Sequence, residues 1–233
     1  DAGHVVSLCT GRNSRSAAGL LARSDGALGD LPLVLLNGAV VIGGEPLARL
    51  AHRTLGGATV RRLVELFRAH GALPMVYDTD DRGGVLYHED RAANTPLALY
   101  LERRRQTVGH IEAVPDLLAR LPAEALEVGT IDREEVVLPL TAAIARELAG
   151  QVRVVNTLTL LSRDAYRWAE VYHRDCGKGA GVLLLARAHG IPPGNIVAIG
   201  DNYNDLDLFA VARHAVAMGN APAEVRVRVF AFL

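Results

Sequence analysis

The stretch GDNYNDLDLF, residues 200–209, places the carboxylates Asp201, Asp205 and Asp207 directly after the apolar run NIVAI. If a helix starts after this strand-like run, Asp205 faces back toward Asp201. Clustered carboxylate oxygens suit Mg²⁺, which keeps some of its water and bridges to phosphate. We therefore predict a Mg²⁺ site with Asp201 and Asp205 as metal residues. The alternatives are a helix N-cap at Asp201 and a solvated helix face.

A second group, CGKGAG at residues 176–181, opens an apolar helix-like run. Lys178 at a helix start is electrostatically unfavourable unless an anion lies there. The stretch is not a P-loop, because Tyr172 stands five positions before Gly177 and Gly179 replaces the Ser or Thr that would bind Mg²⁺. Lys178 is therefore either an anion-binding group or a solvated side chain.

The third group is the triplet TGR, residues 10–12, at the end of the apolar run VVSLCT. A Thr hydroxyl and successive backbone N–H groups at a helix start can hold a phosphate, and Gly11 lets the backbone approach closely. A plain strand-to-helix turn is the competing interpretation, and the triplet alone favours it.

Alternating strand-like and helix-like segments must position these groups. Strands are expected near 5–10, 32–41, 74–78, 84–88, 107–113, 125–131, 151–156, 167–173, 195–199 and 214–218. Helices are expected near 14–24, 57–70, 95–105, 133–149, 177–190 and 203–212. The pattern predicts an α/β protein with a Rossmann-like, mainly parallel core sheet, in which ligands bind beyond the carboxyl ends of the strands.

Local turn signals refine this picture. Asn13 or Ser14 is expected to cap the first helix, and Asn37-Gly38 predicts a hairpin turn. The hairpin-rich middle of the chain predicts an inserted α+β cap domain over residues 51–173, which divides the core into residues 1–50 and 174–233. Asp78-x-Asp80 is read as a polar turn within this domain.

Composition narrows the classes of partner and location. The chain has 233 residues, half of them hydrophobic, which is enough for a core and a smaller domain. The formal net charge is −1 and no basic stripe is interleaved with aromatic residues, so we expect no nucleic-acid partner. No apolar run reaches membrane-spanning length, so no membrane partner is expected. The two cysteines form neither a disulfide framework nor a zinc motif, and a cytoplasmic location is expected.

Taken together, these motifs resemble those of the haloacid dehalogenase superfamily of phosphohydrolases, and most closely the Cof-type branch with its large α/β cap. Thr10 resembles the second motif of the family, Lys178 the third and GDNYND the fourth. LNGAVV resembles the segment that leads from core to cap, and AVAMGNAPAEV the last core strand and the turn after it. The resemblance covers essentially the whole chain.

One motif of the family has no counterpart in this sequence. D-x-D-G-T should precede TGR by about thirty residues, one strand–helix unit, whereas nine residues precede Thr10. We therefore expect the nucleophilic Asp to lie outside this sequence. The first residues enter a strand at once and the last stretch, VRVRVFAFL, stops on apolar residues, so the core is expected to be incomplete at both ends.

The resemblance implies a Mg²⁺-dependent phosphatase that acts on small phosphorylated metabolites, such as sugar phosphates, through an aspartyl-phosphate. It implies that Thr10 and Lys178 are catalytic and that Asp201 binds Mg²⁺ directly, while Asp205 holds a metal-bound water. Thr10 and Asn204 would also contact the phosphate. Three further residues, Gly11, Arg12 and Asn37, are expected to complete the substrate-binding set, and the cap would select the substrate.

Two other interpretations compete with this one. The chain could be a catalytically inactive fragment or pseudoenzyme that retains phosphate or Mg²⁺ binding. A fragment of a P-type ATPase would share a related fourth motif, but the absence of membrane spans and the TGR triplet argue against it. The oligomeric state is left open.

Overall fold

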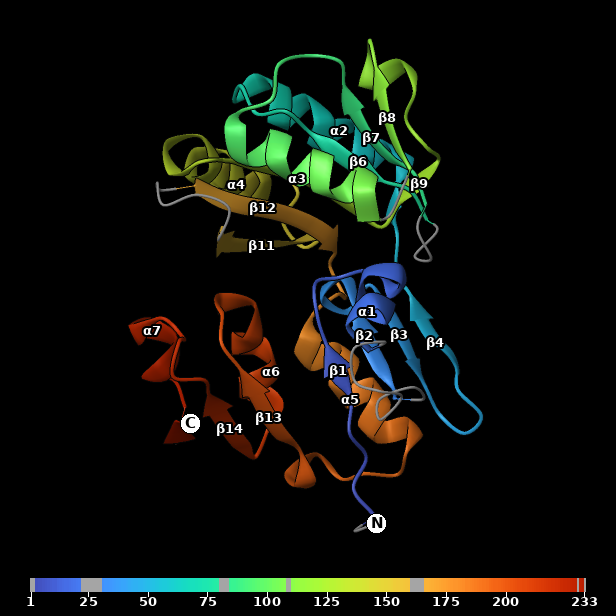
Figure 1. Cartoon of the computed structure of the whole chain (residues 1–233), viewed down its shortest axis with the longest axis vertical. Helices are drawn as coiled ribbons and strands as arrows, with labels where there is room; N and C mark the ends of the chain where they lie inside the picture. Colours follow the sequence, from blue (N-terminus) through green and yellow to red (C-terminus); the bar gives the residue numbers. More distant parts are fainter. Residues whose placement is uncertain are drawn as a thin grey trace. The chain divides into compact units, whose positions relative to one another are not determined.

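The computed structural model describes residues 3–21, 31–79, 84–107, 110–159, 166–229 and 231–232 (Figure 1). The chain divides into two compact units. The core unit comprises Asp1–Arg12, Ala17–His52 and Asp175–Leu233, and the inserted unit comprises Asn13–Ser16 and Arg53–Arg174. Within the described part of the chain, every helix is too short or too polar to cross a membrane.

The core unit contains two small sheets. Its strands are β1 (Leu8–Cys9), β2 (Leu33–Leu35), β3 (Val40–Gly43), β4 (Ala48–His52), β13 (Val197–Gly200), β14 (His214–Ala217) and β15 (Ala231–Phe232). One sheet has the order β1-β2-β3-β4, with β1 parallel to β2 and the remaining pairs antiparallel. The other has the order β13-β14-β15 and is parallel throughout. Both β1 and β13 are therefore edge strands within the described residues.

Helices and short turns connect these strands and place the candidate site. The helical elements are α1 (Ser14–Leu21), η2 (Leu36–Gly38), α5 (Lys178–Ala188), η4 (Pro193–Asn195), η5 (Tyr203–Asp205), α6 (Leu206–Val211) and α7 (Ala223–Arg226). Leu185 of α5 packs with Val34 of β2 and Val41 of β3 in one apolar cluster. Leu208 and Phe209 of α6 pack in a second cluster, with β13 and β14. Both α5 and α6 are therefore packed against strands of the core unit.

The inserted unit is built on a six-stranded sheet with the order β11-β12-β10-β6-β7-β8. The strands of this unit are β5 (Leu55–Gly56), β6 (Met75–Tyr77), β7 (Leu86–Glu89), β8 (Ile111–Val114), β9 (Glu124–Ala125), β10 (Glu127–Arg133), β11 (Val152–Leu158) and β12 (Tyr166–His173). Of these, β5 and β9 form a separate two-stranded antiparallel pair. Its helices are α2 (Gly57–Ala69), α3 (Thr95–Thr107), η3 (Leu117–Ala119) and α4 (Glu134–Glu147). The sheet is antiparallel except for the β7–β8 pair.

Alternating side chains of this sheet enter two separate apolar clusters. Val76 and Val128 pack with residues of α2 and α4. Met75 and Ile131, on the opposite face, pack with Leu97 of α3 and its neighbours. Because side chains in a strand alternate between faces, neighbouring residues such as Met75 and Val76 are both fully buried, each in a different cluster.

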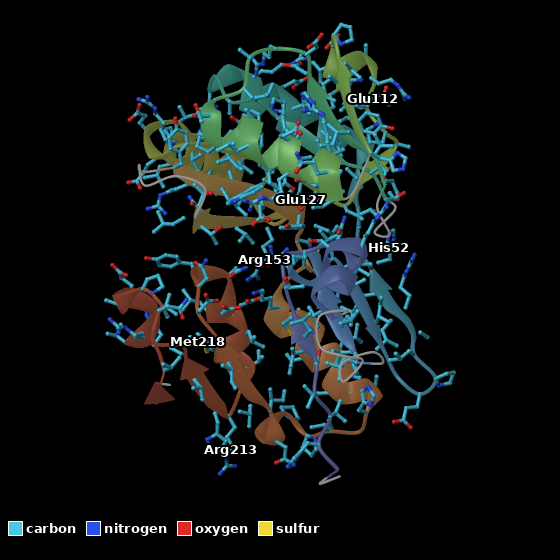
Figure 2. All side chains as sticks on the ribbon, viewed as in Figure 1. His52, Glu112, Glu127, Arg153, Arg213 and Met218 are labelled. Atoms are coloured by element: carbon cyan, nitrogen blue, oxygen red, sulfur yellow. The ribbon has the colours of Figure 1, made fainter. Side chains whose placement is uncertain are left out.

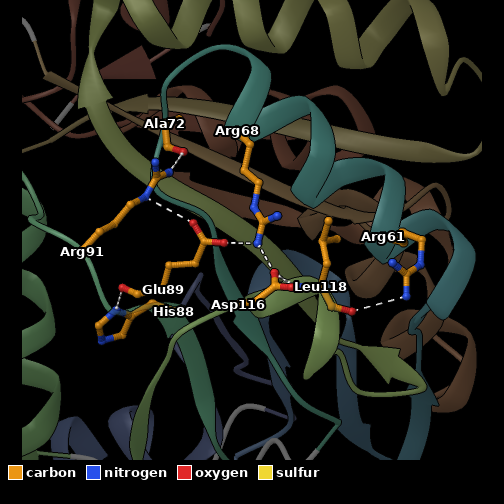
Figure 3. Close-up of polar contacts among 8 residues, drawn as sticks. All are labelled: Arg61, Arg68, Ala72, His88, Glu89, Arg91, Asp116 and Leu118. Atoms are coloured by element: carbon orange, nitrogen blue, oxygen red, sulfur yellow. Dashed lines mark hydrogen bonds and ion pairs between the residues drawn. The ribbon is translucent and has the colours of Figure 1, made fainter.

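Charged groups join α2 to the end of β7 and to the turn after β8 (Figure 3). Arg68 of α2 contacts Glu89 of β7 and lies 2.6 Å from Asp116 Oδ1, while Arg91 Nε lies 3.2 Å from the other oxygen of Glu89. Arg91 also donates to the carbonyl of Ala72 at 2.8 Å. Two acidic groups meet two arginines, so we interpret this network as a structural connection between elements.

Most of the predicted elements are confirmed, and the α/β fold class with them. Asn13 caps α1, because its Oδ1 accepts from the Ser16 N–H at 2.9 Å. The hairpin at Asn37-Gly38 joins the antiparallel strands β2 and β3. The predicted end of the first helix, residues 22–24, lies outside the described residues. Asp78 lies between paired strands β6 and β7 and accepts from the Val85 N–H at 3.0 Å, as the turn interpretation predicts; Asp80 lies outside the described residues.

Three expectations are wrong in detail. The buried strand expected at residues 5–10 is a strand only at Leu8–Cys9, because β1 pairs on one side only, and Val5 and Val6 are 44% and 57% exposed. The helix expected at 203–212 is divided into the 3-10 turn η5 and the short helix α6, which ends at Val211, and Asn202 rather than Asp201 occupies the N-cap. The strand expected at 107–113 begins only at Ile111, because α3 extends to Thr107.

Candidate active site

Three loops of the core unit carry the candidate residues. Thr10, Gly11 and Arg12 follow β1, Lys178 starts α5, and Asp201 follows β13. Strand ends and a helix start thus bring these groups into one unit, as the α/β pattern predicts. The individual contacts show which of them form a cluster.

The centre of the cluster is a buried ion pair. Lys178 Nζ lies 2.6 Å from Asp205 Oδ1, and both residues are buried, with exposed fractions of 6% and 4%. The Asp205 carboxylate is therefore the anion that balances the Lys178 ammonium at the start of α5. A buried pair of this kind is retained only with good geometry and further hydrogen bonds.

The second oxygen of Asp205 has its own donors. Oδ2 accepts from the backbone N–H groups of Asp201 at 2.9 Å and Asn202 at 3.0 Å. Gly200 makes this possible, because a Cβ at that position would lie 2.6 Å from the carboxylate carbon of Asp205. Asp205 therefore holds the loop after β13 and orients Lys178 at the same time.

Asp201 differs from Asp205 in exposure and in partners. Its carboxylate is exposed and accepts a hydrogen bond from Asn220 Nδ2 at 3.2 Å. Asn220 belongs to the MGNA stretch after β14, whose Met218 N–H donates to the Gly200 carbonyl at 2.9 Å. The turn after β14 therefore orients the Asp201 side chain as well as its loop.

The TGR loop forms a compact turn. The Arg12 N–H donates to Thr10 Oγ1 at 3.2 Å, which leaves the hydroxyl hydrogen of Thr10 able to donate to an anion. Thr10 is anchored to β2, because its own N–H donates to the carbonyl of Val34 at 2.8 Å. Arg12 is exposed and Gly11 is half-buried.

Asn37 and Asn204 connect two of these loops. Asn204 Nδ2 donates to Asn37 Oδ1 at 3.0 Å, and the Asn37 N–H donates to the carbonyl of Thr10 at 3.1 Å. Asn37 is 2% exposed, whereas Asn204 is half-buried. The structure thus brings Asn37 together with the TGR loop and with the stretch after β13.

Two neighbouring residues complete the surroundings. Asp207 Oδ2 accepts from the Gly179 N–H at 3.3 Å, so α6 supports the first turn of α5. Burial raises the pKa of the Cys9 thiol to about 11, although the nearby Lys178 ammonium acts in the opposite direction. Cys9 is therefore a neutral thiol at physiological pH and unsuited to act as a nucleophile.

Sequence reasoning left three supporting residues unassigned: Asn202, Asp207 and Asn220. The first two lie in the recognised stretch GDNYNDLDLF, and Asn220 lies in MGNA, so the signal was present. Their roles depend on partners elsewhere in the chain, and the spacing of residues does not specify those partners. The assignments of Thr10, Gly11, Arg12, Asn37, Lys178, Asp201, Asn204 and Asp205 as functional residues stay predictions.

Comparison with known sequences gives one match over nearly the whole chain. A sequence model of haloacid dehalogenase-like hydrolases matches residues 1–229. The 5-amino-6-(5-phospho-D-ribitylamino)uracil phosphatase YitU of Bacillus subtilis is 26% identical over 227 residues, which cover 94% of this chain and 76% of that protein.

Two shorter matches have higher sequence identity. The phosphatase YwtE of B. subtilis is 44% identical over 57 residues, 24% of this chain and 20% of that protein. A Haemophilus influenzae relative is 38% identical over 66 residues, 28% of this chain and 25% of that protein. This chain therefore aligns with a quarter or less of those two relatives.

Solved structures agree on the fold. A haloacid dehalogenase-like hydrolase from Bacteroides thetaiotaomicron superposes with a TM-score of 0.73 at 20% identity, over 97% of this chain and 80% of that chain. A Thermotoga maritima protein superposes with a TM-score of 0.71 at 21% identity, over 98% of this chain and 79% of that chain. At these identities the likeness establishes the fold alone.

Proposed function

This chain belongs to the haloacid dehalogenase-like hydrolase family, and from this premise we propose that it is a phosphatase of small phosphorylated metabolites, with sugar phosphates as the substrate class. The observation that carries the proposal is the buried Lys178–Asp205 pair, which lies beside Asp201 in the same loop system. The names of its relatives, among them a phosphatase of a phosphoribityl compound, support the same reaction class.

The residues of this chain would bind and orient the phosphoryl group. The Thr10 hydroxyl and the Gly11 amide donate hydrogen bonds to its oxygens, and the Lys178 ammonium balances negative charge as a nucleophile approaches. Preorganised donors of this kind are the largest single contribution to many phosphoryl transfers. Asp205 holds Lys178 in place, and Asn204 lies beside the same loop.

The donor set fits Mg²⁺ in part. Asp201 offers an exposed carboxylate of the kind Mg²⁺ prefers, whereas both oxygens of Asp205 already accept hydrogen bonds. No group of three potential metal-binding side chains occurs among the described residues. We propose that Asp201 would bind the ion directly. Asp205 would not bind it directly but would hold the loop that carries Asp201. When bound, Mg²⁺ would neutralise charge on the phosphate.

A nucleophile must be added to this set, and a groove of the core unit indicates where. The groove has a volume of about 250 Å³ and is lined by residues of β1, β13 and α5, among others. On the β13 side, Val197 and Ile199 are 62% and 57% exposed. Among the described residues β1 and β13 each pair on one side, and edges with exposed apolar side chains suit an added strand. We propose that a strand outside this sequence fills the groove and carries the nucleophilic Asp.

In the proposed reaction, the added carboxylate attacks phosphorus and the bond to the substrate oxygen breaks, which forms an aspartyl-phosphate. Water then attacks that phosphorus and releases inorganic phosphate, so the carboxylate is regenerated. Lys178 would stabilise the negative charge in both steps, because its position is held by Asp205 and changes little between them.

The test is hydrolysis of p-nitrophenyl phosphate with and without Mg²⁺, by this chain and by a form that includes its native preceding residues. We expect activity only in the longer form. Activity of the present chain alone would refute the added-strand proposal, because the nucleophile would then lie within it. No activity in either form would favour the inactive, phosphate-binding alternative.

Two substitutions in the active form test the residue roles. Asp201→Ala should abolish the Mg²⁺-dependent activity, and Lys178→Ala should lower turnover by roughly two orders of magnitude or more. Asp90→Ala, which removes an exposed carboxylate from the inserted unit, serves as the control. Full activity of Asp201→Ala would rule out a metal-binding role for Asp201. A small effect of Lys178→Ala on turnover would indicate that Lys178 has only a structural role.

A further inference from the structure

The turn after β2 has an unusual backbone. Leu36, Asn37 and Gly38 have φ angles of 49°, 48° and 92°, all in the left-handed region. Non-glycine residues there cost on the order of 1–3 kcal/mol each, and a leucine in this region is a clear outlier. All three residues are buried, so the surrounding structure must hold the turn in this conformation.

Hairpin closure alone does not account for this geometry. The pairing of Leu35 with Val40 leaves four residues, 36–39, in the turn between β2 and β3. A two-residue hairpin needs positive φ only at its two central residues, whereas three residues in a row have it here. The additional left-handed residue, Leu36, has an N–H that donates to the Arg12 carbonyl at 3.1 Å. The next N–H, of Asn37, donates to the Thr10 carbonyl at the same distance. The strained backbone therefore aims two successive N–H groups at the TGR loop.

The same turn contacts the other two loops of the site. A Cβ at Gly38 would lie 2.2 Å from the Gly177 carbonyl oxygen, so the turn packs directly against the residue before Lys178. On the third side, Asn37 Oδ1 accepts from Asn204 Nδ2. Residues 36–38 thus contact the loop of Thr10, the start of α5 and the stretch after β13.

We infer that Asn37 is a positioning residue, which fixes Asn204 through its side chain and the TGR loop through its backbone. The inference rests on the proposed phosphatase function and replaces a direct role in substrate binding. With an exposed fraction of 2%, Asn37 has almost no surface to offer a substrate. Asn204 is half-buried and retains such a surface, so the effect of Asn37 passes through it.

Asn37→Gly is the most informative substitution, because glycine keeps the left-handed backbone and removes only the side chain. In the catalytically active form we expect kcat for p-nitrophenyl phosphate to fall about tenfold while KM stays roughly unchanged, since a hydrogen bond to a catalytic-site group is lost. A rise in KM with unchanged kcat would instead indicate direct substrate contact and would overturn the inference.

A double-mutant cycle separates positioning from general destabilisation. If Asn37 acts through Asn204, the variant Asn37→Gly/Asn204→Ala should be no slower than Asn204→Ala alone. Fully additive losses would contradict the inference. Gly71→Ala provides the matched control for backbone strain. Gly71 has a φ of 77° in the inserted unit with open space around its Cβ position. This variant should lower the melting temperature and leave kcat unchanged.

A spectroscopic measurement tests the inference independently of activity. In a two-dimensional amide NMR spectrum, Asn37→Gly should shift the side-chain NH₂ signals of Asn204 and leave those of Asn94 in place. Asn94 is held by the Ile131 carbonyl at 2.8 Å in the inserted unit. Unchanged Asn204 signals would refute the positioning role. If the NH₂ signals shift but no form hydrolyses phosphate esters, the proposed function fails and the Asn37–Asn204 contact stands.

Discussion

Two buried carboxylates, one in each unit, show how differently the same chemical group can be held. Asp205 of the core unit is 4% exposed, and its oxygens face an ammonium and two backbone N–H groups. Glu127 of β10 in the inserted unit, labelled in Figure 2, is 2% exposed. It accepts a hydrogen bond from the hydroxyl of Tyr172 at 2.9 Å. Similar burial is thus combined with opposite electrostatic surroundings.

The surroundings of Glu127 favour its neutral form. Burial and the nearby Glu170 carboxylate raise the pKa of Glu127 well above its usual value, although Tyr172 and Arg104 act in the opposite direction. The geometry agrees with this direction. The Tyr172 hydroxyl oxygen lies 2.9 Å from both Glu127 and Glu170, but it has one hydrogen to donate. A proton on one of the two carboxyl groups would satisfy the second contact, in agreement with the raised pKa of Glu127.

The comparison shows that two acids of similar burial can be surrounded by very different donors. Asp205 has a cation and two N–H donors, which stabilise a carboxylate. Glu127 has a second acid and a hydroxyl, which do not compensate for desolvation. The first arrangement suits the phosphate site that we propose, and the second belongs to a closed interior beside a sheet.

The largest expected effect is at Asp205. Asp205→Asn leaves the Lys178 ammonium buried without a counter-charge, which we expect to cost about 3–5 kcal/mol of unfolding free energy. Urea denaturation measures it. Asp201→Asn is the matched control, since the same chemical change at an exposed site four residues earlier should stay within about 0.5 kcal/mol. Equal effects of the two substitutions would invalidate the contrast between the carboxylates.

An intermediate effect with the opposite sign is expected at Glu127. The folded state holds the Glu127 proton more tightly than the unfolded chain, so this group favours folding most at low pH. Its contribution declines as the pH rises from about 4.5 toward the raised folded pKa, by up to about 1.4 kcal/mol per pH unit. Glu127→Gln removes the titration and can still donate to Tyr172. The variant should therefore gain stability relative to wild type between pH 5 and pH 8 in urea titrations. A constant difference across that range would show that Glu127 does not titrate there.

The smallest expected effect is at Glu170. Its charge is the second cause of the raised Glu127 pKa, after burial. Glu170→Gln should therefore lower that pKa and narrow the pH range over which stability declines, without abolishing it. The same titrations measure it, with the exposed Glu135→Gln on α4 as control. If Glu170→Gln matched Glu127→Gln in full, burial would contribute little and our ranking of the causes would be wrong.

Local signals in the sequence predicted much of the fold. The 3.6-residue spacing of apolar positions predicted α2, and Asn37-Gly38 predicted the hairpin between β2 and β3. These signals act within a few residues, so they survive without knowledge of the rest of the chain. The length of β1 was overestimated, because the number of residues that form a strand depends on the partner beside it.

The sequence by itself determined which residue types follow each strand: the triplet TGR, the helix start at Lys178 and the acidic stretch after β13. It also determined the alternation of strands and helices that brings those ends together. Only the tertiary structure decided the pairings, such as Lys178 with Asp205, 27 residues apart, and Asn37 with Asn204, 167 apart. It likewise decided the opposite surroundings of Asp205 and Glu127. The physical reason is that hydrogen-bond partners and desolvation come from segments distant in the chain, so short-range patterns do not contain them.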